Sequence, residues 1–196
     1  MKTVIIKYNA GNTRSVSFAL ERIGINALIT DDADEILTAD NVIMPGVGEA
    51  SSAMQYLREK KLDTVICSLT QPFLGICLGM QLMCNYSEEG KTNCLGIFDQ
   101  DIKLFTSSKF KVPQMGWNTI TDLKTNLFRG IKENEYQYLV HSYYAELGNN
   151  TIAKTNYGIN YSTALNKNNF YGVQFHPEKS GVFGQTILEN FIRITN

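Results

Sequence analysis

The 196-residue chain lacks the marks of several protein classes. No apolar run approaches the roughly 18 residues that a membrane-spanning helix needs, and residues 1–7 read as a short strand interrupted by lysine rather than as a signal peptide. Neither sign of charge is in excess, since 18 basic residues stand against 19 acidic ones. A polyanionic partner such as a nucleic acid or an acidic membrane is therefore not expected. These absences predict a cytoplasmic protein that acts on a small molecule or on another protein.

Metal-ligating residues are scarce as well. The chain has only four cysteines and two histidines, which are Cys67, Cys77, Cys84, Cys94, His141 and His176. The cysteine spacings fit no CxxC motif, and two histidines are too few to complete a zinc site. We expect no metal, no cofactor and no disulfide. A cysteine in a reducing compartment is usually a small buried hydrophobe, so each one needs local evidence before a chemical role is assigned to it.

The first half of the chain has a regular alternation of strands and helices. Apolar strand-like runs at 3–8, 26–30, 41–44 and 72–76 alternate with helical stretches at 13–23, 50–60 and 78–86. Asn12 is expected to cap the first helix and Gly24 to end it. Phe18, Leu20 and Ile23 are expected to face inward. This alternation predicts an α/β fold with a mostly parallel, doubly wound central sheet and flanking helices, whose ligands gather at the carboxyl ends of the strands.

The second half is predicted to be largely β. Strand-like segments follow at 97–105, 117–121, 136–140, 151–156, 163–166 and 170–175, and a closing helix at 185–194. No internal repeat, low-complexity tract or linker divides the chain. Hydrophobic residues make up 43% of it, which suffices for a substantial core. We therefore expect a single domain over residues 1–196.

One cysteine has local evidence for chemistry. Cys77 stands between Gly75 and Gly79, in the G-x-nucleophile-x-G form, at the junction of a predicted strand and a predicted helix. Glycines on both sides permit a sharp turn that lifts the side chain clear of the sheet, and the helix N-terminus behind it favours a thiolate over a thiol. The backbone N–H of Leu78 is then available to an oxyanion. The alternative is a tight turn with an inert cysteine.

A thiolate needs a general base, and the chain offers only His141 and His176. Pro177 follows His176 and holds it in an extended conformation. Residues two apart on an extended segment point to the same side, so the Glu178 carboxylate is expected to reach the imidazole and fix its tautomer. His141 has no carboxylate nearby and is predicted to be structural or to line the pocket wall. The sequence thus predicts a catalytic triad of Cys77, His176 and Glu178.

A second oxyanion donor is expected at the strand exit Pro45-Gly46-Val47-Gly48. Glycines on both sides of Val47 let its peptide rotate at low steric cost, so that the N–H can turn toward an oxyanion. Taken alone, the segment is a plain turn between a strand and a helix. It lacks the longer Gly-Lys pattern of a phosphate-binding loop.

With these residues in place, the chain resembles the class I glutamine amidotransferases. The resemblance rests on Gly75-Ile-Cys-Leu-Gly-Met-Gln81 together with His176-Pro-Glu178, in that order. It implies a flavodoxin-like α/β fold in which Cys77 attacks the side-chain amide of glutamine. Ammonia then leaves, water hydrolyses the glutamyl thioester, and His176 moves the protons. The positions that the resemblance implies for substrate binding are Gly48, Gln81, Ser142 and Tyr143.

A finer resemblance covers nearly the whole chain and is to the family of glutaminase subunits of imidazole glycerol phosphate synthases. It is carried by Tyr8-Asn9-Ala10-Gly11-Asn12, Pro45-Gly-Val-Gly48, Val112-Pro-Gln-Met-Gly-Trp-Asn118 and His141-Ser-Tyr-Tyr144. In that family ammonia passes to a separate (β/α)8 cyclase subunit, which makes imidazole glycerol phosphate and the purine precursor AICAR in histidine biosynthesis. The resemblance implies an obligate heterodimer. Its partner-facing positions are Asn12, Met115, Trp117, Tyr138 and Lys179.

Three positions depart from that family, which often has Asp, Gly and His where this chain has Lys7, Asn9 and Gln114. They leave open a paralogous pair that delivers ammonia to another acceptor. Two further alternatives are a stand-alone cysteine hydrolase that acts on peptides or small amides, and a catalytically silent module that binds a barrel partner. The glutamine-site and interface residues argue against the first, and the complete triad argues against the second.

Overall fold

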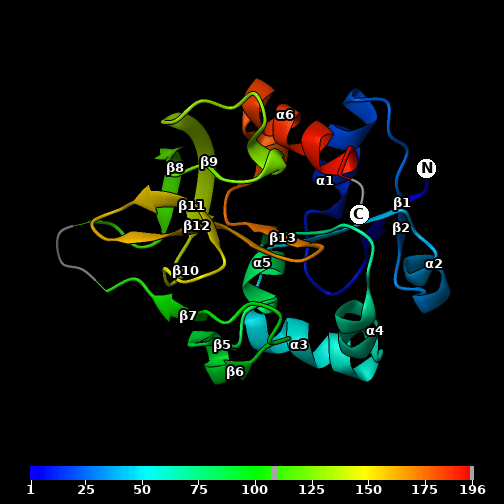
Figure 1. Ribbon diagram of the computed structural model, residues 1–196. Coiled ribbons are helices and arrows are strands. Elements are labelled where there is room, and N and C mark those ends of the chain that lie inside the picture. The colour runs from blue at the N-terminus through cyan, green and yellow to red at the C-terminus, as the bar shows by residue number, and fades with distance from the viewer. Residues whose placement is uncertain (107–109, 195–196) are drawn as a thin grey trace.

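A computed structural model describes residues 1–106 and 110–194 of the chain (Figure 1). Its helices are α1 (Thr13–Arg22), α2 (Ala33–Leu37), α3 (Ala50–Glu59), α4 (Leu62–Ser68), α5 (Leu78–Leu82), α6 (Gly181–Ile192) and the 3-10 turns η1 (Glu89–Lys91), η2 (Asn126–Phe128) and η3 (Pro177–Lys179). Its strands are β1 (Thr3–Ile6), β2 (Leu28–Thr30), β3 (Asn41–Gly46), β4 (Phe73–Cys77), β5 (Tyr86–Ser87), β6 (Thr92–Asn93), β7 (Asp101–Leu104), β8 (Gln114–Ile120), β9 (Glu135–His141), β10 (Tyr143–Ala145), β11 (Thr151–Asn156), β12 (Asn160–Lys167) and β13 (Phe170–Val173).

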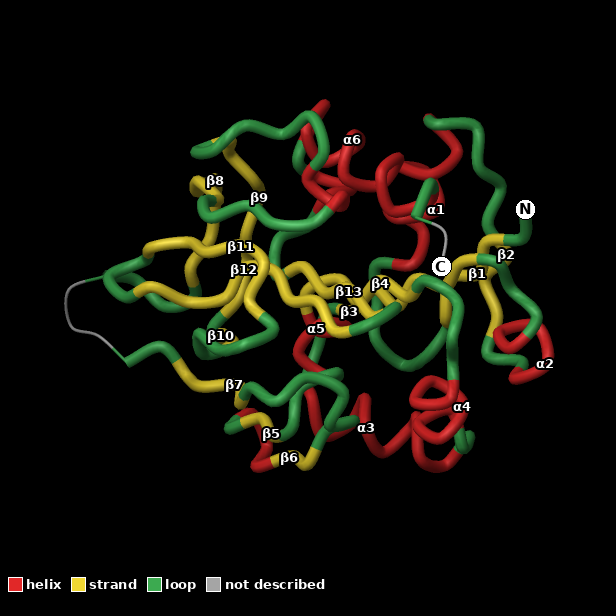
Figure 2. Tube along the Cα trace, viewed as in Figure 1, coloured by secondary structure: helices red, strands yellow, loops and turns green. Residues whose placement is uncertain are grey.

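The large sheet has the order β2-β1-β3-β4-β13-β12-β10-β7-β5-β6, and β11 pairs with β12. The strands from β2 to β13 in this order pair in parallel, whereas β12 pairs antiparallel with each of its neighbours. A separate antiparallel pair, β8 and β9, lies beside the large sheet in the β-rich part of the molecule (Figure 2). The predicted α/β fold with a parallel sheet and a β-rich second half is confirmed.

Two layers of helices cover the parallel strands, one on each face of the sheet. Successive side chains of a strand point to opposite faces, so these strands place apolar side chains under both layers. Val4 and Ile6 of β1 belong to the same core cluster as buried residues of α3, α4 and α5, whereas Ile5 belongs to the cluster that includes residues of α1 and α6. The strands β3 and β4 alternate in the same way, and their fully buried apolar side chains form the centre of the fold. Figure 1 shows α1 and α6 on one side of the sheet and α3, α4 and α5 on the other.

The helix α1 shows where the sequence prediction held and where it was wrong. Gly24 ends it as expected: its φ is 79°, its N–H donates to Glu21 O, and the next N–H donates to Leu20 O. Phe18, expected to face inward, is 57% exposed. The buried stripe is Val16, Ala19 and Leu20, whose spacing of three and four residues Phe18 does not share.

Asn12 stands at the N-cap position of α1, but it does not cap the helix. Its backbone is left-handed, with φ at 79°, and its side chain makes no hydrogen bond to the helix. A cap needs an extended backbone that brings the side-chain oxygen to the first N–H groups. The asparagine amide is therefore free to bind elsewhere.

Three parallel neighbours, β3, β4 and β13, end at the same edge of the sheet. The segments that leave this edge carry Val47 after β3, Cys77 at the end of β4, and His176 after β13. The middle of β9 reaches the same region, because Tyr138 O accepts a hydrogen bond from His176 N at 2.9 Å. The predicted site residues, remote in sequence, thus meet at the carboxyl ends of the strands.

Among the described helices, none has the length and apolar character needed to cross a bilayer.

Candidate active site

Cys77 occupies a strained turn between β4 and α5. Its φ of 54° and ψ of −110° are unusual for a residue with a side chain. The flanking glycines make the turn possible, because a Cβ on Gly79 would overlap the carbonyl oxygen of Met44, and one on Gly75 would press against Gly79. The predicted strand, turn and helix around Cys77 are therefore present, although α5 ends at Leu82 rather than continuing to residue 86.

The thiol of Cys77 is largely buried and has two polar neighbours within hydrogen-bonding range. Its sulfur faces the carbonyl oxygen of Val140 at 4.0 Å, and the amide nitrogen of Gln174 donates to it at 3.6 Å. The Val140 carbonyl suits the protonated thiol, whereas an N–H donor suits the thiolate. The surroundings of the sulfur thus serve both protonation states.

His176 and Glu178 form a buried pair behind the cysteine. The His176 Nδ1 atom lies 2.8 Å from Glu178 Oε1, and both side chains are inaccessible to solvent. Burial alone lowers the pKa of His176, but the Cys77 thiol and the Glu178 carboxylate oppose it and raise that pKa to about 10. His176 Nε2 has no hydrogen-bond partner among the described residues. The Cys77 thiol is nevertheless close enough to raise the pKa of His176. The imidazole is thus held by its Nδ1 edge, with Nε2 unoccupied.

The Glu178 carboxylate has a second donor in Asn12. The Asn12 amide nitrogen lies 2.6 Å from Glu178 Oε1, the same oxygen that His176 contacts. The other carboxylate oxygen, Oε2, is buried and has no partner among the described residues. Two donors thus meet on one oxygen, and Glu178 connects Asn12 at the start of α1 to His176 in the site.

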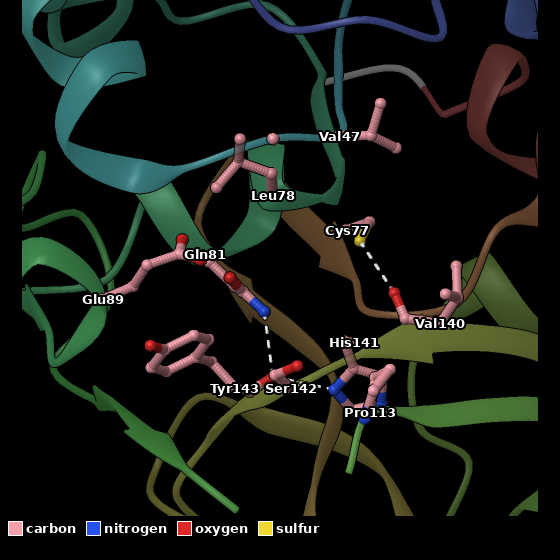
Figure 3. A pocket seen from close by; sticks show the side chains of 11 residues that line it. Val47, Cys77, Leu78, Gln81, Glu89, Pro113, Val140, His141, Ser142 and Tyr143 are labelled. Carbon is pink, nitrogen blue, oxygen red and sulfur yellow. Dashed lines mark hydrogen bonds between the residues drawn. The ribbon is translucent and has the colours of Figure 1, made fainter.

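A cavity of about 290 Å³ opens over the cysteine, as Figure 3 shows. Its lining includes every residue predicted for the oxyanion and the substrate, which are Val47, Leu78, Gly48, Gln81, Ser142 and Tyr143. Cys77, Glu89, Pro113, Val140 and His141 complete the lining. Ligand pockets of proteins start near this volume, so the cavity suits a molecule of amino-acid size.

The turn that carries Val47 is tied to the segment before α1. The Val47 carbonyl accepts a hydrogen bond from Gly11 N at 3.3 Å, and the side chain of Val47 is 40% exposed. Gly48 has a φ of 133°, a conformation that favours glycine. The peptide between Val47 and Gly48 is therefore held from the α1 side by one backbone hydrogen bond.

Gln81 and His141 converge on one backbone carbonyl in the cavity wall. Tyr143 O accepts from Gln81 Nε2 at 3.0 Å and faces His141 Nδ1 at 2.7 Å, which places the proton on Nδ1. Burial lowers the pKa of His141 to about 4, so this ring is neutral and is no charged rival of His176. The prediction that His141 is structural or lines the pocket is confirmed. Its Nε2 faces the Tyr161 hydroxyl, which also reaches Gln114.

The partner-facing positions implied by the resemblance gather around β8, β9 and η3, and they are Asn12, Met115, Trp117, Tyr138 and Lys179. Met115 is 67% exposed and Trp117 is 54% exposed. Trp117 packs edge to face on Tyr138, with 6.1 Å between ring centroids. The N–H of Tyr138 donates to Ser180 Oγ at 2.9 Å, which joins β9 to the end of η3 beside the exposed Lys179.

Two residues of the site, Gln174 and Glu89, and one contact, that of Asn12, escaped the sequence prediction. Gln174 touches the nucleophile, and a signal for it exists, because it lies two residues before His176 on the same extended segment. The contact of Asn12 with Glu178 depends on the left-handed start of α1, which the sequence does not signal. Glu89 lines the cavity because η1 packs against α3, where it accepts a hydrogen bond from Ala50 N at 2.9 Å. No local motif marks that packing.

The four cysteines are free, and the described residues contain no cluster of three or more histidines, cysteines or carboxylates arranged to hold a metal ion. Burial raises the pKa of the Cys84 thiol far above its usual range and that of Cys94 to about 12. These two thiols are therefore poor nucleophiles.

Comparison with known proteins identifies relatives of the whole chain. Residues 4–194 match the family model of glutamine amidotransferase class-I. Imidazole glycerol phosphate synthase subunit HisH of Bacteroides fragilis strain YCH46 is 55% identical over 196 residues, which cover 99% of this chain and all of the relative. The protein of the same name from Shewanella loihica is 47% identical, covering 98% of this chain and 90% of the relative.

Solved structures share the fold at low sequence identity. A protein from Thermoplasma acidophilum described as a putative GMP synthase component has a TM-score of 0.75 at 20% identity, covering 98% of this chain and 92% of that one. PurLQS from Thermotoga maritima has a TM-score of 0.73 at 16% identity, covering 97% of each chain. These likenesses concern the fold alone.

Proposed function

The chain belongs to the class I glutamine amidotransferase family, and from this premise we propose that it is the glutaminase subunit of an imidazole glycerol phosphate synthase in histidine biosynthesis. It hydrolyses glutamine and passes the ammonia to a separate (β/α)8 cyclase subunit, which forms imidazole glycerol phosphate and AICAR. The observation that carries the glutaminase proposal is the Cys77 thiol at the floor of the cavity, with the His176–Glu178 pair behind it. The full-length relatives named HisH support the choice of synthase.

In the proposed reaction the Cys77 sulfur attacks the side-chain carbonyl carbon of glutamine, after His176 has taken the thiol proton. The N–H groups of Val47 and Leu78 bind the oxyanion that forms. His176 then delivers the proton to the leaving nitrogen, the C–N bond breaks, and ammonia departs. Water attacks the thioester, gives a proton to His176, and the sulfur leaves as glutamate forms. Glu178 keeps His176 in the Nδ1–H tautomer throughout.

Substrate recognition is proposed to rest on the polar groups of the cavity wall. Glu89 is the one carboxylate among the described residues that line the cavity, and it suits the α-ammonium group of glutamine. Backbone groups of Gly48, Ser142 and Tyr143, with the Gln81 amide, bind the remaining polar atoms. Glu89→Gln is expected to raise the KM for glutamine more than it lowers kcat.

The partner surface is proposed to be centred on the exposed Met115 and Trp117. An exposed tryptophan beside an exposed methionine is typical of the core of a protein interface. It adjoins η3, and η3 carries Glu178, so the proposed partner docks next to the triad. We further propose that the whole chain works as one amidotransferase domain, in line with a family match over residues 4–194.

The proposal is tested with the purified chain and its barrel subunit. The isolated chain is expected to hydrolyse glutamine slowly, because the Gly-flanked peptide of Val47 has more than one low-cost orientation, and barrel and acceptor together are expected to accelerate it. Glutamate release is the measurement. No glutamate release from the complete mixture would contradict the glutaminase function. Robust turnover by the chain alone, unchanged by barrel and acceptor, would contradict only the gating at Val47.

A further inference from the structure

We infer that the side-chain amide of Gln174 is a further catalytic group, which donates a hydrogen bond to the Cys77 sulfur and stabilises its thiolate. The inference rests on the proposed glutaminase function and deepens it. Gln174 is fully buried at the end of β13, and its Nε2 atom lies 3.6 Å from Cys77 Sγ, within the range of an N–H donor to sulfur.

A chain of hydrogen bonds that begins at the backbone sets the direction of this amide. The carbonyl oxygen of Tyr143 can only accept, so the Gln81 atom that lies 3.0 Å from it must be the amide nitrogen. The second N–H of Gln81 donates to Gln174 Oε1 at 2.9 Å. If the Gln174 amide were flipped by 180°, its nitrogen would face the Gln81 nitrogen, and two donors would oppose each other. Gln174 therefore presents nitrogen, not oxygen, to the sulfur.

The chemistry of the thiolate makes this direction matter. A thiolate is an acceptor only, and a hydrogen bond to a charged acceptor is about twice as strong as one between neutral groups. The carbonyl of Val140, the other polar neighbour of the sulfur, is itself an acceptor and cannot stabilise the anion. Gln174 thus supplies a donor to the thiolate that is independent of His176.

The same chain of hydrogen bonds defines what Gln81 can do for the substrate. Both N–H groups of Gln81 are used, one by Tyr143 O and one by Gln174 Oε1. Only Gln81 Oε1 is left, so Gln81 meets glutamine as a hydrogen-bond acceptor. The wall that recognises the substrate and the group that stabilises the nucleophile are parts of one hydrogen-bonded unit.

The test replaces the donor that faces the sulfur with an acceptor. Gln174→Glu keeps an oxygen for Gln81 and puts a second oxygen in place of the nitrogen that faces the sulfur. The measurement is the rate at which iodoacetamide alkylates Cys77 in the purified full-length chain as a function of pH, read by mass spectrometry of the peptide that contains it. Loss of one hydrogen bond to a charged group is expected to slow alkylation at neutral pH by roughly 10- to 100-fold and to move the half-maximal rate to higher pH by about one to two units.

Two further variants isolate the effect. Gln174→Met removes the donor without adding a charge, has a similar volume, and serves if the glutamate variant does not fold. Gln100 takes the same two substitutions as a control, because it is also buried, lies outside the cavity lining, and has neither amide atom bonded among the described residues. The titratable groups that act on the thiol, His176 and Tyr8, stay unchanged in all of them, as does Glu178, which contacts His176.

Turnover in the complex separates this role from a merely structural one. Gln174→Glu keeps the contact with Gln81, so kcat is expected to fall at least about tenfold while the KM for glutamine stays within about twofold. An alkylation profile that coincides with the wild type in a folded Gln174 variant overturns the inference. Absence of glutamate release by the wild-type complex would count instead against the proposed function, and the alkylation result would still stand.

Discussion

The Asn12 amide nitrogen lies 2.6 Å from Glu178 Oε1, the oxygen that also contacts His176 Nδ1 at 2.8 Å. A residue at the start of α1 therefore holds the carboxylate of the proposed triad. Asn12 is also one of the expected partner-facing positions. A contact with the partner at this residue would act directly on the orientation of Glu178.

Asn12→Ala is expected to lower kcat for glutamine by about 10- to 100-fold in the complex, because a hydrogen bond to a buried carboxylate contributes roughly 1.5–3 kcal/mol. The KM for glutamine should change little, since Asn12 lies outside the cavity lining. Steady-state kinetics of glutamate release measure both. Asn9→Ala is the control, because Asn9 belongs to the same segment but bonds to Ser52 O. Equal kinetics for the two variants would show that the hydrogen bond from Asn12 to Glu178 does not support turnover.

Glu178→Gln is expected to lower turnover by roughly two to four orders of magnitude in a chain that stays folded. The glutamine amide keeps the shape of the side chain, but it favours the wrong tautomer of His176 and removes the charge that supports imidazolium. Glutamate release and urea unfolding are the two measurements. Glu189→Gln, a change on the surface of α6, should leave both at wild-type values. An active Glu178→Gln enzyme would require another group to orient His176.

The proton on His176 is expected to make stability depend on pH in the alkaline range. Folding raises the pKa of His176 from 6.5 to about 10, so the folded state binds the proton more tightly. The resulting stabilisation is complete below pH 6.5 and is lost as the pH rises through about 10. The free energy of unfolding of the wild type should therefore fall, relative to His176→Gln, between these two values in urea titrations.

His141 provides the opposite dependence as a control. Its pKa is lowered from 6.5 to about 4, so the unfolded state binds the proton more tightly. The wild type should lose stability relative to His141→Gln as the pH falls from 6.5 to about 4, and it should show no such change in the alkaline range. If the two variants showed the same pH dependence, the assigned states of both rings would be wrong.

Trp117→Ala is expected to weaken binding of the barrel subunit by about 30-fold or more and to leave the fold intact. An exposed aromatic side chain at the centre of an interface commonly contributes about 2 kcal/mol or more to binding. Calorimetric titration measures the affinity. Leu37→Ala is the control, because Leu37 is exposed on α2 beside the far end of the sheet. Unchanged affinity in Trp117→Ala would place the partner surface elsewhere.

Much of the fold follows from local patterns in the sequence. The strand at 151–156 was predicted with its observed bounds. The turn at Cys77 was predicted from its flanking glycines, which are visible in the sequence and which the close packing around the turn requires. The helices α2 and α4 were not predicted, since they are short and their positions depend on packing against neighbours. Phe18 was wrongly expected to face inward, because it is apolar but lies off the buried stripe of α1.

The residues of the candidate site also divide into those that a local pattern predicts and those that only tertiary packing brings to the site. His176 and Glu178 were predicted to meet because two-residue spacing on an extended segment is a local rule. The same rule, applied one step earlier along the segment, would have included Gln174. Glu89 reaches the cavity only through the packing of η1 on α3, which is a tertiary contact that no local pattern encodes. Asn12 was assigned a position at the N-terminus of α1, but its left-handed backbone directs the amide to Glu178.

The central claim is that Cys77 serves only to release ammonia from glutamine, while the acceptor chemistry belongs to the partner. The most direct measurement is formation of imidazole glycerol phosphate by the reconstituted complex that carries Cys77→Ala, with glutamine or with ammonium salts as the nitrogen source. The account predicts no synthesis from glutamine and nearly wild-type synthesis from ammonium salts, whereas alanine at Cys67, Cys84 or Cys94 should preserve both. Loss of both activities in Cys77→Ala, or retention of both, would contradict it.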